Sequence, residues 1–143
     1  MSAILENLFL GPLDCIYEIE FLKENKITHI ISVIEDNVCS NAIVALHITQ
    51  MNVLLLDVDD APMFEVFERT TRFIRSALAG GGAVYVHCYA GISRSPTVVA
   101  AYLIAEGGMT KEKALEFIAE RRPIIDPNDG FRAALEKWEA THP

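Results

Sequence analysis

The amino-acid sequence predicts an α/β domain, built on a central, mostly parallel sheet of about four or five strands with helices on both sides. Two apolar, β-branched segments, residues 27–35 and 83–86, are typical of strands covered on both faces. Segments with apolar residues at helical spacing, notably 63–79 and 95–108, lie between and after them. Strands that alternate with helices are typical of parallel sheets, because the helices form the crossover connections.

The first third of the chain is predicted to hold a short strand, a helix and a longer strand. Residues 8–11 (LFLG) end at Gly11 and Pro12, a turn-forming pair. Apolar residues about one turn apart predict a helix over 14–24, with Asp14 as its expected cap. After the strand at 27–35, residues 42–48 (AIVALHI) fit either a strand or a short helix.

Residues 52–60 (NVLLLDVDD) are expected to form a buried strand that runs into acidic residues. A helix after Pro62 is expected to end at the three glycines 80–82. The strand 83–86 leads into helix 95–108, which is hydrophobic on all sides and therefore predicted to be central and buried. Pro96 fits an early position in that helix, where its missing N–H costs little.

Two further helices are expected to extend one layer. Thr110 can cap the first, which Pro123 ends, and the second carries Trp138. A turn at 127–131 separates them.

Length and composition predict one globular domain over residues 1–143, since the chain is 51% hydrophobic and 22% charged. The net charge of −8 argues against binding to nucleic acid or to an anionic membrane surface. No signal peptide and no transmembrane segment is expected. Three widely spaced cysteines without a CxxC pair argue against a disulfide framework and a structural zinc site. We expect a monomer without a cofactor or metal, in the cytoplasm or in cytoplasm and nucleus.

The segment HCYAGISRS, residues 87–95, connects the 83–86 strand to the next helix. Backbone N–H groups converge where a strand turns sharply into a helix, and the helix N-terminus adds a partial positive charge. Gly91 allows the positive φ that such a turn can require. The segment is therefore predicted to form a cradle for an oxyanion at the carboxyl edge of the sheet, where parallel sheets bind their ligands.

Cys88 and Arg94 give this cradle its chemistry. A cysteine in electropositive surroundings is expected to be a thiolate at neutral pH and so a nucleophile. Arg94 can grip two oxygens of a tetrahedral anion. In-line attack on phosphorus would form a phosphocysteine intermediate that water hydrolyses, without a metal. Ser95 can donate to the sulfur, and His87 is expected to orient the cysteine backbone. The residues expected to contact the phosphate are Tyr89, Ala90, Gly91, Ile92, Ser93 and Arg94.

His87-Cys88-x5-Arg94-Ser95 matches the signature of cysteine-dependent protein phosphatases, and HCYAGISRSPTVVAAYLI resembles their dual-specificity branch. The segments NLFLGP, ITHIISV, LLLDVDDAP and RRPIIDPNDGF resemble further motifs of that family in the same order. The resemblance covers nearly the whole chain and implies a small, atypical member without a kinase-docking domain. It implies hydrolysis of phosphotyrosine, with or without phosphoserine and phosphothreonine, in protein substrates. The loop carries no lysine, so a phosphoinositide or a polyphosphate RNA end is less favoured.

The family also implies an aspartate on a mobile loop that protonates the leaving group. The pattern Val58-Asp59-Asp60-Ala61-Pro62 resembles the family's acid motif and favours Asp60. Counting back from Phe67 without a gap favours Asp57 instead, because the segment is about three residues short for Asp60. We prefer Asp60, since Asp57 lies inside the apolar run.

Other interpretations stay open beside this one. The sequence also resembles a pseudophosphatase relative that lacks the cysteine, so a phospho-binding scaffold is the alternative function; Cys88 is the feature that favours catalysis. Redox regulation of a low-pKa thiolate is a third, weaker interpretation. Cys15 and Cys39 are expected to be buried, small hydrophobic residues. Asn128 is expected either to cap the last helix or to hydrogen-bond near the loop.

Overall fold

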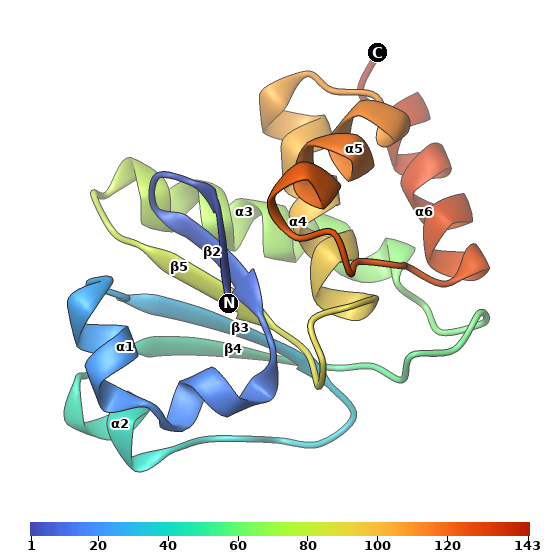
Figure 1. Cartoon of the computed structure of the whole chain (residues 1–143). Coiled ribbons are helices and arrows are strands. Elements are labelled where there is room, and N and C mark those ends of the chain that lie inside the picture. Colours follow the sequence, from blue (N-terminus) through green and yellow to red (C-terminus); the bar gives the residue numbers. More distant parts are fainter.

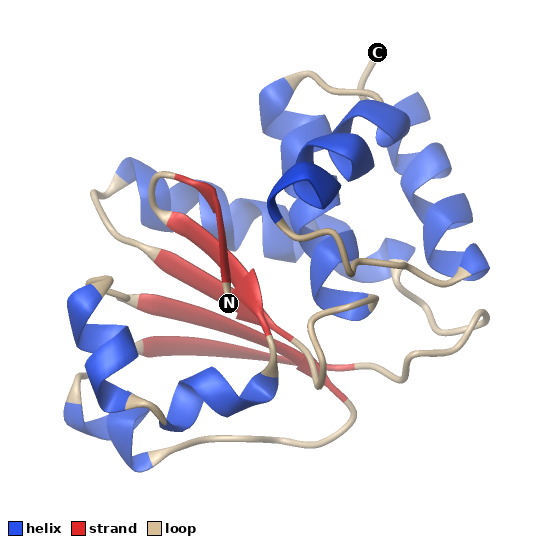
Figure 2. Ribbon diagram, viewed as in Figure 1, coloured by secondary structure: helices blue, strands red, loops and turns tan.

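The computed structural model describes residues 1–143 as a five-stranded sheet with helices on both faces, as predicted (Figures 1 and 2). The strand order is β1-β2-β5-β3-β4, and only the β1–β2 pair is antiparallel. The strands are β1 (Ser2–Leu5), β2 (Leu8–Gly11), β3 (His29–Ile34), β4 (Thr49–Leu54) and β5 (Val84–His87). Since β2, β5, β3 and β4 run parallel, their carboxyl ends meet at one edge of the sheet.

The helices divide into two layers that cover opposite faces of the sheet (Figure 1). One layer holds the 3-10 helix η1 (Leu13–Tyr17), α1 (Ile19–Glu24) and α2 (Asn41–Ala45). The other holds η2 (Phe64–Val66), α3 (Phe67–Ala79), α4 (Arg94–Gly107), α5 (Lys111–Arg121) and α6 (Asp129–Ala140). No helix is both long enough and apolar enough to cross a membrane.

Side chains along each strand point alternately to the two faces of the sheet and so pack into two separate hydrophobic cores. Phe9, Ile30 and Tyr85 belong to the cluster that packs under α1 and α2. Their neighbours Leu10, Ile31 and others of the same strands belong to a larger cluster of 25 residues under α3, α4 and α6. This alternation is the two-residue period of a strand, with both faces buried as a parallel sheet requires. The α4 helix lies in the larger core, and its residues from Arg94 to Ala101 are all buried, as its apolar sequence predicted.

The predicted helix 14–24 is wrong in its start and its continuity. Residues Leu13–Tyr17 form a 3-10 helix, and α1 begins only at Ile19. Asp14 lies within the 3-10 turn and makes no cap hydrogen bond. The break follows from Glu18, whose extended backbone (φ −99°, ψ 90°) separates the two turns, a geometry that apolar spacing alone does not reveal.

The expected buried strand over 52–60 is also displaced. The strand β4 covers Thr49–Leu54, with Leu54 exposed, because it lies at the edge of the sheet. Residues 55–60 form an irregular segment. Because β3 lies between β4 and β5, the strands β4 and β5 are not neighbours in the sheet. Residues 42–48 resolve as the α2 helix, with Ser40 as its cap, followed by a turn. The antiparallel strand β1 was not predicted.

Several predicted features of the helix N-termini are confirmed. The Thr110 side chain accepts a hydrogen bond from the Lys113 N–H and caps α5. Asn128 caps α6 by accepting from the Phe131 N–H, so residues 129–131 form the first turn of that helix rather than a separate turn. Pro96 lies in the first turn of α4, whose N-cap position is Ser93.

Candidate active site

The loop of residues 88–93 joins β5 directly to α4 at the carboxyl edge of the sheet (Figure 1). Within it, Gly91 has a φ of +70°, in the left-handed region that favours glycine. A side chain at this position would also collide with Gly11 and with the guanidinium of Arg122. The turn therefore has the sharp form that the sequence predicted, and α4 begins with its N-terminus directed at the loop.

Cys88 lies at the base of this loop and is only 2% exposed. Its Sγ atom is 3.1 Å from the Oγ atom of Ser95, which is fully buried in the first turn of α4. The serine hydroxyl can therefore donate to the sulfur in its anionic form. This contact places Ser95 beside the Cys88 sulfur, as the sequence predicted.

Arg94 is held by two groups from other parts of the chain. Its Nη1 atom donates to the backbone oxygen of Leu55 at 2.9 Å and to the carboxylate of Glu35. The guanidinium is largely buried, whereas the Glu35 side chain is half exposed. The hydrogen bond from Arg94 holds the pKa of Glu35 below its usual value, so this carboxylate stays charged at neutral pH. The Nε atom of Arg94 is buried without a protein partner and is thus available to a phosphate oxygen.

His87 connects Cys88 to the interior of the sheet. Its Nδ1 atom lies 2.9 Å from the backbone oxygen of Cys88, and its Nε2 atom lies 2.6 Å from the Ser32 hydroxyl. A carbonyl can only accept, so Nδ1 carries the proton and Nε2 accepts from Ser32. Gln50 donates in turn to the Ser32 oxygen at 2.9 Å. Burial lowers the pKa of His87 to about 4, which keeps the ring neutral and suits an orienting role rather than that of a base.

Comparison with known proteins agrees with this geometry. The family model "Dual specificity phosphatase, catalytic domain" matches residues 8–141. The chain belongs to the dual specificity phosphatase family.

Two relatives illustrate the similarity. Mouse dual specificity protein phosphatase 15 is 38% identical over 138 residues, which are 96% of this chain and 57% of that protein. Human serine/threonine/tyrosine-interacting protein is 38% identical over 147 residues, covering 99% of this chain and 66% of that protein. The chain thus spans only about half to two thirds of the length of these relatives.

Solved structures give the same result. The crystal structure of DUSP15 superposes with a TM-score of 0.90 at 36% identity, covering 97% of this chain and 86% of that one. The human tyrosine phosphatase-like serine/threonine/tyrosine-interacting protein superposes with a TM-score of 0.89 at 33% identity, covering 99% and 96%.

Arg122 is a residue of this candidate site that the sequence did not single out. It follows α5, is 9% exposed, and donates to the backbone oxygens of Gly91 (2.8 Å, from Nε) and Ala90 (3.1 Å, from Nη2). Its Nη1 atom donates to the Ser2 hydroxyl at 3.2 Å. These hydrogen bonds fix the orientation of the peptide groups of Ala90 and Gly91. The only sequence signal was a second arginine beside an expected helix end.

The acidic segment after β4 lies against the N-terminus of α6. Asp57 accepts a hydrogen bond from the Asn128 side chain at 3.0 Å, and Asp59 accepts from the Gly130 N–H at 3.2 Å. The Asn128 N–H donates to the Ser93 hydroxyl at 3.1 Å, so Asn128 is both the helix cap and a support of the 88–93 loop. Asp60 has no hydrogen bond to the loop and lines a shallow hollow beside Glu35.

The remaining predicted residues lie where the loop places them. Ser93 is buried, whereas Tyr89, Ala90 and Ile92 are exposed at the rim. Cys15 is buried as expected, but Cys39 is exposed, because it precedes the cap of α2 on a surface turn instead of packing in the core. The expectation for Cys39 is therefore wrong.

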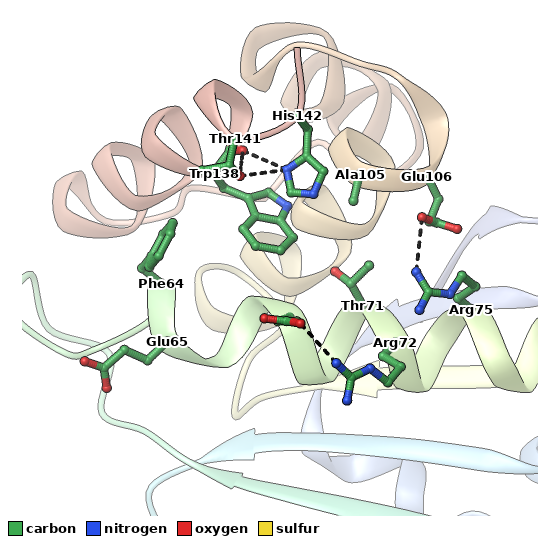
Figure 3. Close-up of a pocket in the computed structure, with 11 residues that line it drawn as sticks. Phe64, Glu65, Thr71, Arg72, Arg75, Ala105, Glu106, Trp138, Thr141 and His142 are labelled. Carbon is green, nitrogen blue, oxygen red and sulfur yellow. Dashed lines mark hydrogen bonds and ion pairs between the residues drawn. The ribbon is translucent and has the colours of Figure 1, made fainter.

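The largest hollow of the molecule, about 670 Å³, is not at this site. It lies between α3, α4 and the end of α6, under Trp138 (Figure 3). Its charged side chains are largely paired with each other, Arg72 with Glu68 and Arg75 with Glu106. No residue of the 88–93 loop lines it.

Proposed function

We propose that this domain is a phosphoric monoester hydrolase that removes phosphate from phosphotyrosine, and also from phosphoserine and phosphothreonine, in protein substrates. The observation that carries the proposal is the buried Cys88 sulfur at 3.1 Å from Ser95, beneath a loop closed by Arg94. A nucleophile below the anion and donors around it suit in-line displacement at phosphorus. Membership of the dual specificity phosphatase family supports the same reaction class.

In the first step, the Cys88 thiolate attacks phosphorus while the bond to the ester oxygen breaks. Arg94 and the loop N–H groups hold the charge on the equatorial oxygens. A general acid protonates the leaving oxygen, giving the free hydroxyl of the product. In the second step, water attacks the phosphocysteine, the P–S bond breaks and the thiolate returns, with the Ser95 hydroxyl stabilising it. The same carboxylate, now ionised, takes the proton from the attacking water.

We assign the general acid to Asp57, with Asp60 as the alternative that the sequence motif favours. Asp57 is joined to the 88–93 loop through Asn128 and Ser93, by hydrogen bonds of 3.0 and 3.1 Å. The family spacing counted without a gap supports the same residue. Asp60 has no comparable connection to the loop. An acid must reach the leaving oxygen, and this favours the aspartate that is anchored beside the loop.

The decisive test is hydrolysis of a small aryl phosphate by the wild type and by Cys88→Ser in the presence of a chelator. Turnover by the wild type that disappears in the variant supports the proposal. Binding of vanadate without turnover between pH 5 and 8 would instead support a phospho-binding scaffold. That alternative is favoured by the similarity to the serine/threonine/tyrosine-interacting protein, described as tyrosine phosphatase-like.

Paired variants separate the two candidate acids. Asp57→Asn is expected to lower kcat by about 100-fold and to make kcat fall more steeply as the pKa of the leaving group rises, since the leaving oxygen then departs without a proton. Asp60→Asn is expected to stay close to wild type. The opposite pattern would assign the acid to Asp60.

A further inference from the structure

Exposed apolar side chains occur in the 88–93 loop and in the segment that holds Arg94. Ten large hydrophobic residues are exposed in the whole chain: Tyr89 and Ile92 belong to the loop, and Leu54, Leu56 and Val58 lie within three residues of Leu55, whose carbonyl accepts from Arg94. Three of these, Leu54 (55%), Leu56 (57%) and Val58 (42%), follow one another at alternate positions from the end of β4. Exposed apolar side chains that cluster in this way are typical of a binding surface.

These three side chains line a hollow of about 370 Å³ that adjoins Arg94. The other residues that line it are Glu35, Leu55, Asp60, Ala61 and Pro62. Glu35 and Leu55 are the two groups that hold the Arg94 guanidinium. The hollow therefore adjoins the two groups that hold Arg94, while no residue of the 88–95 segment lines it. A segment whose phosphate lies against Arg94 would reach the hollow past Glu35 and Leu55.

The charge on this side of the site has one sign. Residues 27–68 contain no lysine or arginine, whereas they contain seven acidic residues. Two of these, Asp60 and the half-exposed Glu35, line the hollow. Asp36, Asp57 and Asp59 are exposed and stand next to its lining residues in the chain. The cations that face the loop, Arg94 and Arg122, are buried and bonded within the protein. A phosphorylated segment that approaches from this side meets a negative field that basic residues of its own would offset.

We propose that Leu54, Leu56 and Val58 form a specificity subsite for an apolar residue next to the phosphorylated one, in a substrate segment that also carries basic residues. This inference rests on the proposed function and names its substrate class. The occupant is a segment of the substrate because the hollow opens beside the phosphate-binding arginine, and because its charge is complementary to a basic segment. A segment rich in acidic residues is selected against by the same charges.

Phosphotyrosine peptides that differ in one feature provide the test. The reference peptide carries leucine on both sides of the phosphotyrosine and arginines beyond. The second has serine in place of leucine, and the third has glutamate in place of arginine. We expect kcat/KM to fall about tenfold for the serine peptide, the scale of one buried leucine, and at least threefold for the glutamate peptide, with that second difference reduced at high salt.

Variants connect the preference to the subsite. Leu54→Ser and Leu56→Ser are each expected to lower kcat/KM for the leucine peptide about fivefold, to leave the serine peptide unchanged, and to keep wild-type turnover of a small aryl phosphate. Val44→Ser is the matched control, since Val44 is 67% exposed on α2, away from the site. Equal kcat/KM for the leucine and serine peptides, or variants that slow the aryl phosphate equally, would overturn the proposal.

Two further measurements separate this inference from other outcomes. The affinities of the same peptides are measured for Cys88→Ser, with and without Leu54→Ser. These affinities test the subsite independently of turnover. A wild type that turns over no aryl phosphate would contradict the proposed function, but it would leave this test of the subsite valid. Light scattering of the wild type and Leu56→Ser tests for self-association. A wild-type dimer that this substitution converts to monomer would assign the apolar surface to a second copy of the chain and refute a substrate subsite.

Discussion

Replacing Arg122 with methionine keeps much of its volume but removes every hydrogen bond that it donates to the 88–93 loop. The Gly91 oxygen, at 2.8 Å from Nε, belongs to a buried residue, so it loses its partner without access to water. The Ala90 oxygen, at 3.1 Å from Nη2, belongs to an exposed residue and can bond to water instead. One unsatisfied buried carbonyl and the loss of the remaining bonds cost about 2–4 kcal/mol of unfolding free energy.

The loss also acts on the reaction, because the carbonyls of Ala90 and Gly91 are then free to rotate. Because a peptide group is planar, the N–H groups that follow these carbonyls rotate with them. Removing one preorganised donor from an oxyanion site costs about 100-fold or more in kcat. Arg122→Met is therefore expected to lower kcat on an aryl phosphate about 100-fold and to weaken vanadate inhibition by at least tenfold. Arg122→Lys keeps the charge without the forked geometry and is expected to lie between the two.

Steady-state kinetics, vanadate inhibition and urea unfolding of the same preparations measure these effects. Arg121→Met is the matched control, since the neighbouring Arg121 is more exposed and contacts only Phe117 and Glu120. A variant Arg122→Met that keeps its stability within 1 kcal/mol and its vanadate inhibition within threefold of wild type would refute the reasoning that this side chain orients the loop.

Three other predictions concern the same site. Glu35→Gln removes the charge beside Arg94 and is expected to lower kcat/KM about fivefold above pH 5, the scale of a half-exposed ion pair; because the pKa of Glu35 is lowered, an unchanged kcat/KM at pH 6 would contradict its role. Gly91→Ala is expected to abolish turnover, since it combines a φ of +70° with a collision against Arg122, and crystallography or vanadate binding would show whether the loop still forms. Burial lowers the pKa of His87 to about 4, so below pH 6.5 the unfolded chain binds a proton at this residue that the folded chain does not bind. The free energy of unfolding of the wild type is therefore expected to fall by about 2–3 kcal/mol between pH 6.5 and 4.5. Urea unfolding of His87→Gln should show a smaller decrease.

The local part of the site could be predicted because it is contiguous in the chain. Cys88, Gly91, Arg94 and Ser95 fall within eight residues between a strand and a helix, so spacing and backbone geometry together fix how they face one another. The same holds for caps such as Thr110, whose partner is three residues away. Boundaries that depend on neighbouring strands were harder: β4 lies at an edge, so its apolar residues continue beyond the strand into an exposed segment.

What the sequence determined by itself is the Cys88–Arg94 loop between a strand and a helix and the α/β class, since both follow from short-range periodicity and spacing. Only the tertiary structure decided what holds that loop. Glu35 reaches Arg94 across 59 positions, Arg122 reaches Gly91 across 31, and Asn128 reaches Asp57 across 71. A buried arginine or a loop carbonyl bonds to whichever segment folding brings against it, and residue type alone does not indicate that partner.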